Sequence, residues 1–183
     1  MKRRILALLF GAAMVFALAA CGGGDAGEAP ADEEQSSDQA AEQAETPEKT
    51  EYKIGETWTV DGLWEMTVTG VTETADRNEY DEREPTAVYI VDYTYTNIGF
   101  EDDSGFWDGL YLSADSSIID NAGTMGYSYP GDVSYYPKET PVGATCKAQA
   151  CIGVDTAGSF KLIVSQYDAN GEEHDATFLV EVS

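Results

Sequence analysis

The chain has 183 residues, of which 34 are acidic and 10 are basic, and its formal net charge is −24. Nucleic acid and anionic lipid are poor partners for such a chain, because both are recognised through basic patches. Solubility is the simplest reason for this charge, and cations and basic proteins remain open as partners.

Residues 1–20 have the layout of an export signal. Lys2, Arg3 and Arg4 form a basic cap, and an apolar run from Ile5 to Ala20 follows it. A basic start, a short apolar run and small residues at its end are typical of a secretory signal peptide. A transmembrane helix needs about 20 apolar residues, and the run is shorter than that.

Cys21 directly follows Leu18-Ala19-Ala20, and this sequence matches the lipobox of bacterial lipoproteins. We expect cleavage between Ala20 and Cys21 and attachment of diacylglycerol to the Cys21 thiol, with acyl chains such as palmitate. Two long acyl chains bury enough methylenes to contribute about 20 kcal/mol of membrane binding. The motif therefore predicts a lipid anchor on the outer face of a cell membrane.

Residues 21–50 hold the lipidated cysteine and an acidic linker in this interpretation. Residues 22–50 contain nine acids and one base, and they contain no Ile, Leu, Val, Met, Phe, Trp or Tyr. Such a segment cannot bury enough apolar surface to offset its conformational entropy, so we expect it to be disordered. A flexible chain of this length spans about 30 Å and would hold a folded domain away from the bilayer.

Residues 51–183 are enough for one domain with its own core, and they carry 25 acids and 6 bases. Apolar residues alternate with period two nearly throughout, and no stretch has helical periodicity. We expect strands at 57–60, 63–71, 87–96, 110–113, 117–119, 145–154, 160–164 and 178–182. Asp61-Gly62 indicates a type I′ hairpin turn, and 110–113 pairs with 117–119 in a second predicted hairpin. This pattern predicts an all-β, immunoglobulin-like antiparallel β-sandwich of seven to eight strands.

The domain resembles the immunoglobulin-like lipoprotein domain family of Gram-positive bacteria, which is itself similar to a secreted immunoprotective antigen of mycobacteria. The resemblance depends on the strand from Val88 to Thr96 with Asn97-Ile98-Gly99 after it, and on Pro141-Val142-Gly143 before the apolar pair Ile152 and Val154. It covers roughly residues 52–182. The resemblance implies an immunoglobulin-like fold and an extracellular location, and it implies no catalytic residues.

Cys146 and Cys151 are too close in sequence to form the bond that joins the two sheets of an antibody domain. In a continuous strand they would lie about 16 Å apart on opposite faces, whereas a disulfide needs Cα atoms within about 7 Å. An oxidising location favours a bond. The alternation of the strand favours two free thiols, and this is our expectation.

Catalytic and metal chemistry have weak signals in this sequence. The single histidine, His174, lies next to Asp175 with no nucleophile motif beside it, so we interpret it as an isolated surface residue. Two acidic loops, 76–84 and 101–108, cluster oxygen donors, and Asp168-Ala169-Asn170-Gly171 resembles the start of a calcium loop without its downstream spacing. We expect solvated acidic loops, no bound metal and no cofactor.

Aromatic residues provide the candidate ligand loop. Tyr127, Tyr129, Tyr135 and Tyr136 lie among glycines and prolines, and Trp107 lies in another loop. Rigid aromatic rings on loops suit sugars and peptides, because they give contact area at a low cost in entropy. The alternative is that these rings cover the ends of the sandwich core.

These observations predict a lipid-anchored extracytoplasmic lipoprotein that is not an enzyme. We expect it to be held to the bilayer through Cys21 and to present its β-sandwich to an envelope or extracellular protein or peptide. Three alternatives remain open: a carbohydrate- or peptidoglycan-binding module that uses the tyrosine loop, an accessory hydrolase that uses acidic loop residues, and a structural protein with no ligand.

Overall fold

A computed structural model describes residues 49–102 and 108–182. The predicted signal peptide, Cys21 and most of the predicted linker lie outside the described residues, and so does Trp107. Within the described part of the chain, no helix is long and apolar enough to cross a membrane.

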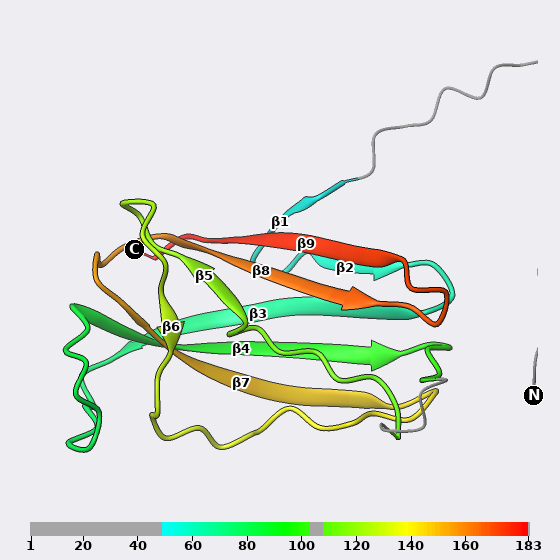
Figure 1. The fold of residues 1–183 in the computed structure, drawn as a ribbon, viewed down its shortest axis with the longest axis horizontal. Helices are drawn as coiled ribbons and strands as arrows, with labels where there is room; N and C mark the ends of the chain where they lie inside the picture. Colours follow the sequence, from blue (N-terminus) through cyan, green and yellow to red (C-terminus); the bar gives the residue numbers. More distant parts are fainter. Residues whose placement is uncertain (1–48, 103–107, 183) are drawn as a thin grey trace, which may run out of the picture. The chain divides into compact units, whose positions relative to one another are not determined.

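The described residues form nine strands in two sheets (Figure 1). The four-stranded sheet has the order β1 (Glu51–Lys53), β9 (Glu173–Val180), β8 (Phe160–Tyr167) and β5 (Ser117–Ile119). The five-stranded sheet has the order β2 (Thr57–Val60), β3 (Trp64–Thr74), β4 (Ala87–Asn97), β7 (Thr145–Val154) and β6 (Tyr127–Ser128). The chain crosses between the two sheets after β1, β4, β5 and β7. The prediction of a β-sandwich is confirmed.

The core lies between the sheets because alternate residues of the long strands are apolar. Trp64, Met66 and Val68 of β3 and the tyrosines of β4 are at most 1% exposed. The Trp64 ring packs edge-on against the rings of Trp58 and Phe100, with each pair of ring centroids 5.7 Å apart. Each such burial contributes about 2–3 kcal/mol, so the period-two pattern largely determines which face of each strand points inward.

Two predicted hairpins differ from the structure. Val60 pairs with Trp64, so the β2–β3 loop has three residues, with Gly62 at φ 75°, and is not a two-residue type I′ turn. The predicted hairpin of 110–113 with 117–119 is wrong. Leu110 forms an isolated bridge with Thr140, and β5 pairs with β8 in the other sheet.

Strand number and direction also differ from the prediction. The described residues form nine strands: β1 and β6, of three and two residues, were not predicted, and the predicted strand 110–113 is not formed. β1 pairs parallel to β9, whereas all other strand pairs are antiparallel. β9 begins at Glu173 and not at residue 178, and β8 continues to Tyr167.

Asn97 at the end of β4 is fully buried and joins two loops to the sandwich. Its side-chain amide donates hydrogen bonds to the carbonyl oxygens of Phe100 (3.0 Å) and Thr140 (2.8 Å), and its Oδ1 accepts one from the N–H of Phe100 (2.8 Å). The chain segments after β4 and before β7 are therefore held together at this end of the sandwich.

The two cysteines of β7 are free and buried, as predicted. Cys146 belongs to the core between the sheets, whereas Cys151 belongs to a small cluster with Val88 and Tyr129. The opposite faces of one strand keep the two sulfur atoms apart.

Candidate functional site

Two loops cover the outer face of the five-stranded sheet. Val88 and Cys151 point to this face, and Tyr129 packs on them. The loop before β4 is joined to the tyrosine loop, because the N–H of Asn78 donates to the Tyr129 hydroxyl (2.7 Å) and the Asn78 amide donates to the Pro130 carbonyl (2.7 Å). The result is a second, smaller core outside the sandwich.

The tyrosines of the candidate ligand loop have different roles. Tyr129 is only 4% exposed and belongs to this second core, which fits the alternative that rings of this loop cover a core. Tyr127 is half-buried in β6, and the guanidinium of Arg83 lies 4.2 Å from the centre of its ring. Arg83 also forms a 2.6 Å ion pair with Asp81, and the hydrogen bond between them lowers the pKa of the Asp81 carboxyl.

Tyr135 and Tyr136 are exposed, at 46% and 64%. Their segment runs beside β7 (Figure 1), where Gln149 donates its N–H to the Tyr135 carbonyl at 2.7 Å and accepts at its side chain from Ser134 N–H at 2.8 Å. The ammonium of Lys147 lies 4.5 Å from the centre of the Tyr135 ring. Among the described members of the predicted set, Tyr136 is therefore the most exposed.

A hollow of 450 Å³ lies between this segment and the residues after Leu110. We call it the Tyr111–Tyr136 hollow; its lining includes Tyr111, Asp115, Tyr129, Tyr136 and Gln149. Tyr111 is 40% exposed, and burial together with the nearby Asp115 carboxylate raises its pKa. A hollow lined by two exposed rings and a carboxylate suits a cationic side chain, because the ring faces and the carboxylate both attract positive charge. Tyr111 was not selected from the sequence, where it appeared as part of a predicted strand.

The predicted acidic loops do not form a metal cluster in the described residues. Asp81 is paired with Arg83, and residues 103–107 lie outside the described part of the chain. Across residues 49–102 and 108–182, the single set of three ligand-type side chains close enough to share an ion is Asp168, Glu172 and His174.

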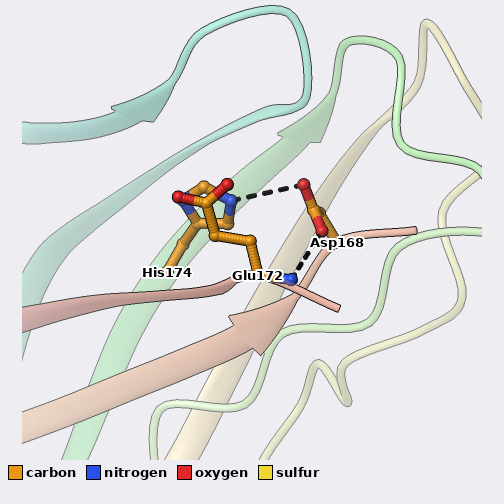
Figure 2. Close-up of side chains that lie close together, drawn as sticks. All are labelled: Asp168, Glu172 and His174. Atoms are coloured by element: carbon orange, nitrogen blue, oxygen red, sulfur yellow. Dashed lines mark hydrogen bonds and ion pairs between the residues drawn. The ribbon is translucent and has the colours of Figure 1, made fainter. Parts of the chain in front are cut away.

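His174 is not an isolated surface residue, so that prediction is wrong. Figure 2 shows its ring facing the carboxylate of Asp168 across the turn between β8 and β9, with Nε2 of His174 3.7 Å from Oδ2 of Asp168. The side chains of His174 and Asp168 are only 18% and 8% exposed. The hairpin pairing of Gln166 with His174 brings the histidine back beside the turn, which the sequence alone had placed only near Asp175.

Asp168 organises this turn. Its Oδ1 accepts hydrogen bonds from the N–H groups of Asn170 and Glu172, both at 2.9 Å. The hydrogen bond from the Glu172 N–H is the main reason that the pKa of Asp168 lies below its ordinary value. The carboxylate is therefore held ionised, with Oδ2 directed toward the histidine.

Comparisons with known proteins give the following matches. No family model and no curated protein matches this chain. Among solved structures, the "putative lipoprotein (ycdA)" of Bacillus subtilis is 16% identical with a TM-score of 0.46, covering 63% of this chain and 36% of that one. The yjhA protein of Bacillus subtilis is 17% identical with a TM-score of 0.43, covering 72% of this chain and 99% of that one. This chain thus spans about a third of the first structure. Neither match identifies a function for it, and membership of the immunoglobulin-like lipoprotein family stays a prediction.

Proposed function

We propose that this chain is a non-catalytic lipoprotein, anchored outside a cell membrane through acylated Cys21, that binds a basic segment of a protein or peptide. The observation that carries the binding proposal is the Tyr111–Tyr136 hollow, whose lining includes two exposed rings and the Asp115 carboxylate. A lysine or arginine side chain fits this chemistry better than a neutral group, because it would meet ring faces and a negative charge together.

Charge supports the same kind of partner. Residues 51–183 carry 25 acids against 6 bases, so the domain attracts basic partners over a distance and repels anionic polymers. The burial of Tyr129 weakens the carbohydrate alternative, because fewer exposed rings remain on which a sugar could stack.

In the described residues, the four carboxyl groups with a shifted pKa all have it lowered, which gives no support to the hydrolase alternative. A general acid of a hydrolase needs a carboxyl pKa raised toward neutrality. Hydrogen bonds lower the pKa at Glu56, Asp81 and Asp168, and at Asp120 they outweigh the opposite effect of burial. Asp168 and Glu172 are close together, but a carboxylate held ionised by backbone N–H groups is a poor proton donor.

Capture from envelope extract by the soluble domain, residues 50–183, tests the binding proposal. We expect the parent domain to retain a protein that elutes with salt, and we expect Tyr136→Ala and Asp115→Asn to lose it. Tyr167→Ala is the matched control, because Tyr167 is 56% exposed but does not line the hollow. Basic segments of the retained protein are then made as peptides, and their binding to the parent domain is measured. Equal retention by all four domains would refute the role of the hollow, and retention of peptidoglycan fragments alone would favour the carbohydrate alternative.

Metabolic labelling with a fatty-acid probe tests the anchor separately. We expect the parent chain to take up the label and Cys21→Ser to lose it. Label on the Cys21→Ser chain, or an unmodified thiol at Cys21 in the native product, would refute the proposed location without affecting the hollow.

A further inference from the structure

We propose that the turn between β8 and β9 binds one divalent transition-metal ion through Nε2 of His174 and the carboxylates of Asp168 and Glu172 (Figure 2). None of its three residues lines the proposed peptide-binding hollow. The site joins residues that are two, four and six positions apart in sequence and lie at one end of the four-stranded sheet.

The first evidence is a buried ring nitrogen without a hydrogen bond. Nε2 of His174 is buried and has no hydrogen-bond partner, and its distance of 3.7 Å from Oδ2 of Asp168 is too long for a hydrogen bond. A buried polar atom without a partner is costly and needs an explanation. An ion between the two atoms supplies one, because ligands bound at about 2.0–2.2 Å with tetrahedral angles lie about 3.4 Å from each other.

The second evidence is that two of the three ligands are already held in place. Oδ1 of Asp168 accepts from two backbone N–H groups, and Oδ2, which accepts a 3.2 Å hydrogen bond from the Asn170 side-chain amide, faces the histidine. The imidazole stands edge-on to the Trp64 ring, with centroids 5.5 Å apart. The third ligand, Glu172, is exposed, and its oxygen lies within 4.8 Å of the other two donor atoms. Rotation of one solvent-facing side chain is therefore enough to close the site.

The donor set indicates the class of ion. One imidazole nitrogen with two carboxylate oxygens suits zinc and its first-row neighbours, whereas calcium prefers six to eight oxygen ligands. Two carboxylates also balance the charge of a divalent ion. Three protein ligands leave at least one position for water.

The alternative is a protonated His174 that forms an ion pair with Asp168. The two interpretations predict opposite behaviour. A metal needs the neutral imidazole, so acid releases the ion, whereas an ion pair needs the charged imidazole and gains nothing from added metal.

The test uses the full chain in detergent micelles after removal of metal with EDTA. Zinc, calcium and magnesium chlorides are titrated separately by calorimetry and by thermal melting. The chain has a single histidine, so ¹⁵N-histidine labelling gives one imidazole whose Nε2 resonance reports ligation directly. This measurement also separates binding at His174 from zinc bound by a cysteine thiol.

Three variants make the test specific. Glu172→Gln removes an exposed ligand without disturbing the fold, and Glu173→Gln is its matched control, with the same charge change one position along the chain. We expect one zinc per chain, a shifted Nε2 resonance, at least about tenfold weaker binding in Glu172→Gln, no binding in His174→Gln, and little change in Glu173→Gln. The proposal is overturned if the parent chain binds no zinc, if Nε2 does not respond at saturation, or if both glutamate variants weaken binding equally.

Discussion

Replacement of Asn97 by alanine should destabilise the domain more than any other single change to an amide side chain in the described residues. The substitution removes two donated hydrogen bonds and one accepted hydrogen bond at a fully buried position. At about 1 kcal/mol net for each bond, the loss is about 3 kcal/mol. The Thr140 carbonyl still accepts from Leu110 N–H at 3.0 Å, so most of the cost comes from the peptide groups of Phe100.

Urea denaturation measures this loss as a change in the free energy of unfolding. A stable domain of this size has a free energy of unfolding of about 5–15 kcal/mol. A loss of about 3 kcal/mol is therefore large but still leaves a folded variant to measure. Asn121→Ala is the control, because Asn121 is exposed in a turn, and we expect a change within about 0.5 kcal/mol.

Asn97→Asp sharpens the same prediction. The carboxylate can still accept from the Phe100 N–H. Its second oxygen, however, would face the carbonyl oxygens of Phe100 and Thr140, to which the asparagine amide donates hydrogen bonds. Burial and these carbonyls would raise the pKa of the new carboxyl in the folded state, so its destabilisation should be greatest above that pKa and should lessen as the pH falls. A cost below about 1 kcal/mol for Asn97→Ala, or no pH dependence specific to Asn97→Asp, would refute the reasoning.

Three further predictions concern a glycine, an acid and a thiol. Gly109→Ala places a methyl group against a backbone carbonyl at φ 137° and should cost about 2–4 kcal/mol in the free energy of unfolding, whereas Gly123→Ala, also at positive φ but in open space, should cost about 1 kcal/mol. Burial raises the pKa of Asp120, but hydrogen bonds from its own turn and from Thr156 lower it below 3.8 overall. The Asp120 carboxylate therefore stabilises the fold above about pH 4, and this stabilisation is lost as the pH falls through the lowered pKa. In Asp120→Asn, the free energy of unfolding should fall less steeply at acid pH than in the parent. Burial raises the pKa of the Cys151 thiol, so iodoacetamide should modify it at neutral pH only after denaturation, as mass spectrometry would show.

The long strands could be predicted because each buries one face. In β4 and β7, alternate apolar residues specify the inward side over ten or more positions, and the predicted bounds agree closely with the structure. The short strands carry no such signal. β1 has three residues, and its parallel pairing with β9 joins the two ends of the domain, a contact that local sequence does not specify.

The predicted hairpin after Leu110 shows the limit of local pattern. Two short apolar segments with turn residues between them fit a hairpin, but Ile118 of β5 pairs with Leu162 in β8, in the other sheet. Leu110 and Ile118 are both fully buried. Both apolar segments are therefore buried, but the partner of each is set by long-range contacts that the local pattern does not specify.

The positions of the candidate site residues also depend on contacts between segments that are far apart in sequence. Tyr129 looked like its neighbours in sequence, and its burial follows from Val88 and Cys151 on the outer face of the sheet. The histidine cluster did have a local signal, because a turn at Asp168–Gly171 folds the next strand back along the previous one. A prediction that had placed His174 opposite Gln166 would have brought the histidine close to the Asp168 carboxylate.

The two proposed sites are close enough to need different probes. Tyr111 lines the hollow, and it also lines a cavity of 320 Å³ that reaches Asp168 and Tyr167. A change at Tyr111 would therefore confuse the two functions, whereas Tyr136 lines no cavity that contains Asp168, Glu172 or His174. Tyr136→Ala should leave zinc binding unchanged and Glu172→Gln should leave peptide capture unchanged. If each variant impairs both activities, the two regions act as one site joined through Tyr111, and the ion would then serve to position the partner.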